Sequence, residues 1–499
     1  MARSFFSQVS HYLGGQVLQQ IAGLISFPTF TRVLTTAQYG LMSVVNSTIP
    51  MVMPFAKCGM SFASERFYAQ YRAKGEENEF FSTTILFSLG WCLVFCGLYE
   101  LVLGGALWLL PPSVLAKGAT RTLLHLLMLV GAQIFLKAQL SVLLQITRAK
   151  QETLAYNTAT TVETYLSLGL SLTLLFTMGL KLEWLFIGQM LATGTVLLYL
   201  LRRLSKTLRI RRSFYRKAIA KESLAFGTPM IWNEIAAVAQ GMADRYVILF
   251  FLGEEAVGVY SVGFNVSMIL IALTMVPVYA TLGPVVFQKH AEGGEAAARA
   301  FLEPVGRWLL RLLFPLIAGV EATAAPLVVL LASSKYREAA VITSINFAGL
   351  VFWNAANVLG IAIMIAKQTR LHRNVVLMGT AVNIVLAIGL VQVWHIRGAA
   401  VAALITALLA AAVLCYRAYR VLPIRIWGSY LVPSIVASVA MYFAVTQIHF
   451  AIGWLTLAVR VALGIALYVP LLLAFDREAR TDVRAAWAKI RERRRQIPS

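Results

Sequence analysis

Charged residues are scarce in this sequence. They make up 13% of its 499 residues, about half of the share found in an ordinary soluble protein. Hydrophobic residues make up 59%, and apolar runs of about 20 residues, long enough to cross a bilayer as helices, recur along the chain. The composition excludes an ordinary soluble protein and predicts an all-α polytopic membrane protein. An outer-membrane β-barrel is excluded because the runs are continuous rather than alternating.

Motifs of catalysis and metal binding are also missing. The four cysteines lie in apolar segments without a Cys-x-x-Cys pair or histidine partners, at Cys58, Cys92, Cys96 and Cys415, so we expect no metal or redox site. The sequence has no Gly-x4-Gly-Lys-Ser/Thr loop, no His-Glu-x2-His and no Gly-x-Ser-x-Gly. We therefore do not expect the chain to be an enzyme, to hydrolyse ATP or to hold a cofactor.

The apolar runs predict about fourteen transmembrane helices. A basic linker over 206–222 separates two groups of six, so we expect an N-terminal lobe over 1–205 and a C-terminal lobe over 223–420. Two further helices are expected within 421–475, and a basic amphipathic helix on the membrane surface over 476–499. The expected spans are about 8–31, 41–63, 81–103, 122–147, 154–178, 183–201, 223–250, 257–283, 308–332, 340–366, 375–394, 399–416, 429–447 and 453–475.

Lysine and arginine orient these helices. The net charge of +22 would suggest nucleic acid in a soluble protein, but cytoplasmic loops of membrane proteins also collect basic residues. With the N-terminus inside, 33 of the 44 basic residues fall in inside segments and seven in outside loops. We therefore expect both termini to be cytoplasmic, contact between the basic segments and anionic membrane lipids, and no nucleic-acid partner. The first run lacks a small-residue cleavage site, which predicts a retained helix.

A short pattern occurs twice in the sequence. Leu34, Gly40 and Ser43 are spaced as Leu-x5-Gly-x2-Ser, and the same spacing returns 218 residues later, from Leu252 to Ser261. Because six is an even number of spans, the two halves are expected to share one orientation and to be related by an axis along the membrane normal. The polar faces of the equivalent helices then meet at a central cavity. We expect this cavity to be lined by Gln19, Asn46, Asn233, Gln240 and Trp353.

Two stretches around this pattern resemble a known family. They are FPTFTRVLTTAQYG, from Phe27 to Gly40, and DRYVILFFLGEEAVGVYS, from Asp244 to Ser261. Both are similar to signature segments of the polysaccharide transporters (Wzx-like oligosaccharide flippases) of the multidrug/oligosaccharidyl-lipid/polysaccharide (MOP) superfamily. The number and spacing of spans extend the resemblance over the whole chain. An Arg-Asp pair early in the first helix, typical of the lipid II flippases, is absent.

The resemblance implies a function. It implies alternating access of two lobes in the cell inner membrane and translocation of a polyprenyl-diphosphate-linked oligosaccharide. The product would be a surface polysaccharide such as O-antigen, capsule or exopolysaccharide. Polysaccharide polymerase and chain-length machinery are then the expected protein partners.

Four basic residues lie well inside the expected spans, whereas Arg311, at the inner edge of 308–332, is counted with the inside segment before it. A diphosphate carries at least two negative charges, and a dry site for it needs cations. Lys57, Lys137 and Arg245 are therefore the candidates for contact with a diphosphate. Snorkelling to the headgroups is the alternative for Lys57 and Arg245, and Arg245 could instead pair with Asp244. Arg460, alone in its span, is expected to snorkel.

Carboxylates lie inside the spans as well. A buried carboxylate can hold a proton near neutral pH, so Glu163, Glu234 and Asp244 are candidates for coupling transport to protons or sodium. Glu321 is a further candidate that could equally be a helix-packing residue. For each of them, a structural ion pair between helices is the alternative.

Three other functions compete with a flippase. A cation-coupled drug exporter of the same superfamily normally has twelve spans, so the two C-terminal helices argue against it. A membrane-embedded polysaccharide polymerase or ligase usually carries a large outer loop, whereas every outside loop expected here is shorter than about 20 residues. An energy-independent scramblase is disfavoured by the carboxylates of the span at 223–250.

Overall fold

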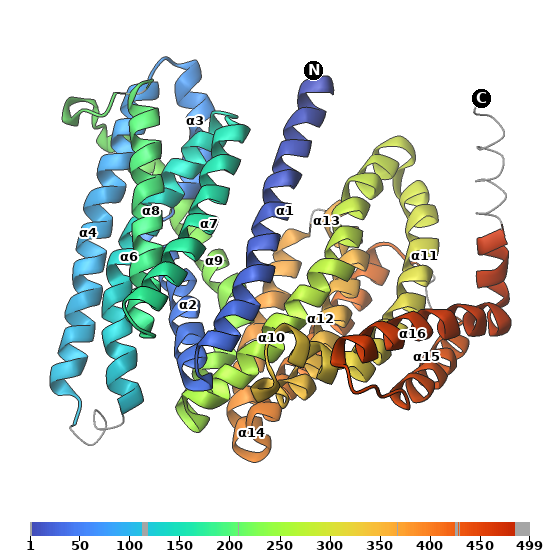
Figure 1. Cartoon of the computed structure of the whole chain (residues 1–499). Coiled ribbons are helices and arrows are strands. Elements are labelled where there is room, and N and C mark those ends of the chain that lie inside the picture. Colours follow the sequence, from blue (N-terminus) through green and yellow to red (C-terminus); the bar gives the residue numbers. More distant parts are fainter. Residues whose placement is uncertain are drawn as a thin grey trace, which may run out of the picture. The chain divides into compact units, whose positions relative to one another are not determined.

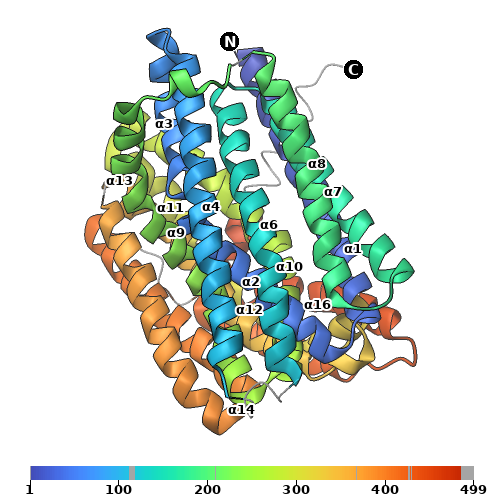
Figure 2. The same ribbon diagram turned by 90° about the vertical axis from the view of Figure 1, so that its left-hand side faces the viewer.

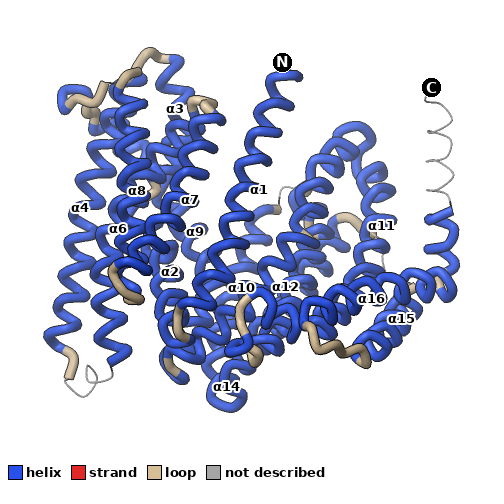
Figure 3. The backbone as a smooth tube through the Cα atoms, viewed as in Figure 1, coloured by secondary structure: helices blue, strands red, loops and turns tan. Residues whose placement is uncertain are grey.

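The computed structural model describes residues 2–111, 118–207, 209–366, 368–424, 428 and 430–484. Within them, all regular secondary structure is helical, and loops join the helices (Figure 3). Nine helices of this part are long and apolar enough to cross a membrane, or ten if one bent pair of helices counts as a span. The prediction of an all-α polytopic membrane protein is confirmed. The expected count of fourteen spans stays a prediction.

The chain divides into two compact units, Met1–Tyr246 and Val247–Ser499. The first unit begins with α1 and ends within α9 (Figure 1). Its helices are α1 (Ala2–Val33), α2 (Thr36–Lys57), α3 (Met60–Ala73), α4 (Glu77–Leu109), α6 (Gly118–Ala149), α7 (Thr153–Thr177), α8 (Leu182–Ser205), the short η1 (Arg212–Phe214) and the first part of α9 (Lys217–Leu252).

Helix α6 is the centre of the first unit. It packs against α2, α3, α4 and α8, while α7 packs against α8 and α1; α4 and α6 run side by side in both views (Figures 1 and 2). The end of this bundle near α3 holds a buried apolar core that includes Met60, Phe80, Phe81 and Leu200. This packed core fixes the positions of the helices that carry the polar side chains of the first unit.

The junction between α1 and α2 follows from its sequence. Thr35 Oγ1 accepts a hydrogen bond from the Gln38 amide, and Gln38 Oε1 accepts one from the Thr35 amide, which is the capping box that starts a helix. Gly40 and Ser43, one turn and two turns into α2, are both buried. In the second unit, Gly258 and Ser261 are likewise buried at the start of α10, just after α9 ends. The repeated pattern thus marks a helix junction in each case.

The second unit is built on α12. This helix packs against α10, α11 and α14, and α15 and α16 pack on each other and on α11. The helices α11 and α14 are each broken inside, at Gly293 and Gly294 and at His395, and the second break falls between the expected spans 375–394 and 399–416. The elements are α10 (Glu254–Thr274), α11 (Val276–Leu331), η2 (Ser334–Tyr336), α12 (Ala339–Leu359), α13 (Ile361–Ile365), α14 (Thr369–Val421), α15 (Leu431–Thr446) and α16 (Gly453–Phe475).

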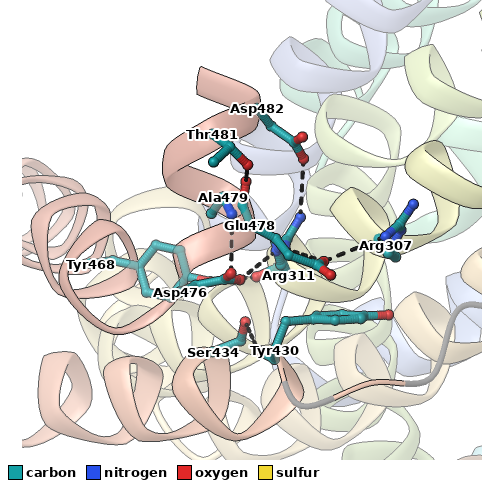
Figure 4. A network of polar contacts seen from close by, with 10 residues as sticks. All are labelled: Arg307, Arg311, Tyr430, Ser434, Tyr468, Asp476, Glu478, Ala479, Thr481 and Asp482. Carbon is teal, nitrogen blue, oxygen red and sulfur yellow. Dashed lines mark hydrogen bonds and ion pairs between the residues drawn. The ribbon is translucent and has the colours of Figure 1, made fainter. Parts of the chain in front are cut away.

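A buried arginine fixes the start of the C-terminal segment (Figure 4). Arg311 of α11 is 1% exposed and pairs with Asp476 at 2.7 Å, and with Glu478 and Asp482 at 3.3 and 3.6 Å. Asp476 Oδ1 also accepts the amide hydrogen bond of Ala479 and so caps the helical turn that follows α16. Of the basic tail expected over 476–499, residues 485–499 lie outside the described residues.

Candidate functional site

Two glycines bring α9 close to the junction of α2 and α3. Cys58 and Gly59 have left-handed backbone angles, with φ of 48° and 72°, and they end α2 at Lys57. A Cβ on Gly227 of α9 would lie 2.5 Å from the carbonyl oxygen of Gly59, so only glycine permits this approach. Glu234 follows Gly227 by seven residues, about two helical turns, which places it near the end of α2.

Lys57 and Glu234 form an ion pair at this crossing. Lys57 Nζ donates a hydrogen bond to Glu234 Oε1 at 2.6 Å, and the two side chains are 8% and 26% exposed. The ammonium also lies 5.9 Å from the ring centre of Phe62. Glu234 Oε2 is buried and has no hydrogen-bond partner within the described part of the chain. Lys57 is therefore held by a carboxylate, and the alternative of snorkelling to headgroups does not describe it.

The other end of α9 lies along the first half of α2. Arg245 is buried; its Nε donates to Ser43 Oγ at 2.9 Å, and its Nη1 donates to the Gly241 carbonyl at 2.9 Å. Tyr246 and Thr48 share a hydrogen bond of 2.9 Å between their hydroxyls. The helices α2 and α9 are thus antiparallel neighbours with a cation at each end of their contact. Arg245 lies eleven residues beyond Glu234, on the other side of a 48° bend in α9 between Ala236 and Val238.

A second ion pair lies between α6 and α7. Lys137 Nζ is 3.8 Å from Glu163 Oε1, with side chains 32% and 20% exposed. Thr193 of α8 donates to the same carboxylate at 3.0 Å. One turn away, Gln133 Nε2 donates to Gln189 Oε1 at 2.7 Å. Three helices therefore present a polar layer inside apolar surroundings.

Sequence reasoning missed Gln189 and Thr193. Their spacing of four residues places both on one face of α8, which matches the spacing of Gln133 and Lys137 on α6. This periodicity was the signal that could have identified them.

The predicted cavity residues lie in both units. Gln19, Asn46 and Gln240 are half-buried in α1, α2 and α9 of the first unit. Asn233 lies in α9, but its side chain is outside the described part. Trp353 lies in the second unit, where it stacks on His372 with ring centres 6.1 Å apart. Asp244 is buried in α9, and Glu321 is exposed on α11.

The prediction that Arg460 snorkels is wrong. Its side chain is buried in α16 and donates to the carbonyl oxygens of Ile448, Ala322 and Thr446. These carbonyls lie in α11 (Ala322), at the end of α15 (Thr446) and in the loop that follows it (Ile448). A guanidinium with five donors satisfies several such carbonyls at once, so burial costs less than the isolated position in the sequence suggested.

The structure joins candidates that the sequence had assigned to different roles. Lys57 and Lys137 were assigned to a diphosphate, and Glu234 and Glu163 to ion coupling, yet each lysine is paired with one of these carboxylates. A cation held by a single carboxylate keeps donors for a second anion, since an ammonium has three. An anion that contacts the lysine would therefore weaken its hold on the carboxylate.

Charge pairs inside a multi-pass bundle of apolar helices mark candidate functional positions of a membrane protein. The model of the polysaccharide biosynthesis protein family matches residues 6–290, more than half of the chain. The chain belongs to this family.

Solved structures show which fold the chain shares. The inward closed lipid II flippase MurJ has a TM-score of 0.74 at 15% identity, over 94% of this chain and 99% of that one. An inward-facing multidrug resistance transporter of the MATE family has a TM-score of 0.65 at 16% identity, over 81% and 94%. A MOP superfamily transporter from Pyrococcus furiosus has a TM-score of 0.51 at 16% identity, over 83% and 93%. No match was found among curated proteins.

Proposed function

We propose that this chain is a flippase that moves a polyprenyl-diphosphate-linked oligosaccharide across the cell inner membrane for surface polysaccharide synthesis. The match to the polysaccharide biosynthesis family carries the proposal. Lys57 and Lys137 support it, because each is a cation that lies beside a carboxylate within the first unit. A diphosphate is the part of such a substrate that most needs cations in a membrane.

Lys137 is the better placed of the two lysines for the diphosphate. Its side chain is 32% exposed, against 8% for Lys57, and its distance from the carboxylate is 3.8 Å rather than 2.6 Å. A looser, more accessible pair exchanges its partner at lower cost, because less of the attraction is lost when the lysine turns to another anion. Arg245 is the third cation of the proposed route.

The carboxylates give a route to ion coupling. When a diphosphate takes over Lys137, Glu163 loses its cation, and loss of a neighbouring positive charge favours the protonated form of a carboxylate. Substrate binding and proton uptake then favour each other, because each removes the competitor of the other. Glu234 and Asp244 are proposed to act in the same way with Lys57 and Arg245, and sodium is the alternative coupling ion.

The proposed flippase has the architecture that the sequence predicts. Two six-helix lobes with a common orientation, over 1–205 and 223–420, rock about a central cavity, and both termini are cytoplasmic. In the described part of the chain, nine or ten helices are long and apolar enough to cross a membrane, and α11 and α14 are each broken inside; both observations support about fourteen crossings.

Lys137→Ala tests the proposal. In a host strain that lacks its own copy, this variant should insert in the membrane yet abolish surface polymer, and the lipid-linked oligosaccharide should accumulate in the inner membrane. Lys181→Ala is the matched control, since Lys181 is an exposed residue between α7 and α8. It should support normal export.

Normal export by Lys137→Ala would refute the role of Lys137. Polymer loss without accumulation of the lipid-linked oligosaccharide would point to an earlier step of synthesis. Normal polymer combined with changed drug resistance would favour the exporter. Loss of polymerisation with the repeat units already on the outer leaflet would favour a polymerase or ligase.

A further inference from the structure

A basic cavity of about 510 Å³ opens at one end of the first unit, where α6 turns into α7 beside the end of α8. It is lined by four cations, Lys150, Arg202, Arg203 and Lys206, by one carboxylate, Glu152, and by the ring of Tyr199. The volume falls within the range of sites for small molecules, about 300–1,000 Å³. The charge pairs assigned to transport lie on other residues, so this cavity is independent of the proposed function.

Two of the four cations already hold an anion. Lys150 and Arg203 bind the two oxygens of Glu152 at 3.1 and 3.2 Å. Although burial acts to raise the pKa of Glu152, these two neighbours lower it overall. Arg202 and Lys206 are exposed and pair with no carboxylate within the described part of the chain. The cavity therefore carries an excess of three positive charges. Its pairing with Glu152 shows that these cations can hold an anionic group.

The surface of α8 next to the cavity is apolar. Leu191, Leu198 and Arg202 fall on one stripe of the helix, and both leucines are more than half exposed. The stripe extends eleven residues back from Arg202, about 16 Å, which is close to the thickness of one leaflet of the hydrocarbon core. Leu154, at the start of α7 beside the cavity, is also mostly exposed.

This combination of charge and apolar surface identifies a class of ligand. Phosphate oxygens suit a site with two arginines and two lysines, and acyl chains suit a leucine stripe that begins at the same arginine. We infer that the cavity binds the phosphate group of an anionic phospholipid, with the lipid chains lying along α8. Tyr199 lies at the boundary, where amphipathic aromatic rings are favoured.

The experiment compares two double variants of the purified full-length protein in neutral detergent. Arg202→Ala/Lys206→Ala removes two cations that line the cavity, and Arg209→Ala/Arg212→Ala removes two exposed cations of the same basic segment that do not. Native mass spectrometry measures the affinity for phosphatidylglycerol, for phosphatidylcholine and for inorganic pyrophosphate. Thermal unfolding in the same detergent checks that both variants are folded.

The cavity variant should bind phosphatidylglycerol about 25-fold more weakly than the native protein. This is about fivefold for each cation, as expected for about 1 kcal/mol each at a membrane surface. The control variant should stay within about twofold, and phosphatidylcholine should bind more weakly than phosphatidylglycerol to the native protein. Glu152→Gln, which removes the competing carboxylate, should tighten phosphatidylglycerol binding.

Two results would overturn the inference. Equal weakening in both double variants would mean that the lipid responds only to the total charge of the basic segment. Pyrophosphate binding as tight as that of phosphatidylglycerol would make the ligand a soluble phosphate compound rather than a lipid. If the cavity variant did not fold, weaker or unchanged binding by Glu152→Gln would overturn the inference by itself.

Discussion

The pair of Lys57 and Glu234 can be tested by exchanging its charges. Lys57→Ala leaves Glu234 without its cation, Glu234→Gln leaves Lys57 without its anion, and the double variant Lys57→Glu/Glu234→Lys restores a pair in the opposite sense. A purely structural pair requires only that the two charges be opposite. A lysine that also contacts a diphosphate must stand at the end of α2.

The size of the effect follows from the geometry. At 2.6 Å and an effective dielectric constant of about 20, the attraction is about 6 kcal/mol, and desolvation of both groups offsets much of it. Removing one partner of a buried pair typically costs about 3–5 kcal/mol. Because the Glu234 side chain is 26% exposed, water screens part of the loss, and we expect about 3 kcal/mol for Lys57→Ala.

Two assays are needed. Thermal unfolding of the purified proteins in one detergent should show both single variants below the native protein, with most of the loss recovered in the exchanged pair. Surface polymer should be lost in Lys57→Ala and should stay lost in the exchanged pair, since the cation has moved to α9. Recovery of both stability and export by the exchanged pair would refute a substrate role for Lys57 and leave it a structural residue.

Two further predictions concern packing. Arg311→Met should lower stability by about 3–5 kcal/mol, because the buried carboxylate of Asp476 loses its cation. Asp476→Asn should cost less, since Glu478 remains 3.3 Å from Arg311 and asparagine still caps a helix. Thermal unfolding of both variants checks the order, and the reverse order would contradict it. Gly227→Ala should destabilise the protein more than Gly241→Ala does. A Cβ atom at position 227 would meet the backbone of Gly59, whereas a Cβ atom at position 241 would have no such neighbour within 4 Å. Equal unfolding temperatures of the two variants would contradict the close crossing of α9.

The helices were predictable because their signals are local. Continuous apolar runs, the capping residues at Thr35 and Gln38, and the positions of lysine and arginine lie within a few residues of the feature that they specify. The repeated Leu-x5-Gly-x2-Ser pattern predicted equivalent positions, and the structure places both copies at a junction between two helices.

The partners of the buried charges could not be predicted in the same way. Lys57 and Glu234 are 177 residues apart, and their contact depends on the approach of two glycine backbones that no helical periodicity encodes. Arg311 was counted among the residues of an inside segment. Its carboxylate partner, Asp476, is 165 residues away, so the sequence around Arg311 does not indicate the pair. A buried charge needs a partner, because burying an unpaired charge is costly. This rule does not identify which of several carboxylates the partner is.

The pairing changes the meaning of the candidate residues. Cations for the substrate and carboxylates for coupling had been two independent sets, and a transporter with two such sets needs a further device to link them. In the structure, each lysine is paired with one carboxylate, and on the proposed function a diphosphate that approaches the lysine would link the two sets by competing with that carboxylate. On the proposed function, Glu163 and a diphosphate compete for the same ammonium group of Lys137. This competition predicts that Glu163→Gln, which removes the carboxylate and keeps Lys137, binds the lipid-linked substrate more tightly than the native protein does; weaker binding by Glu163→Gln would contradict it.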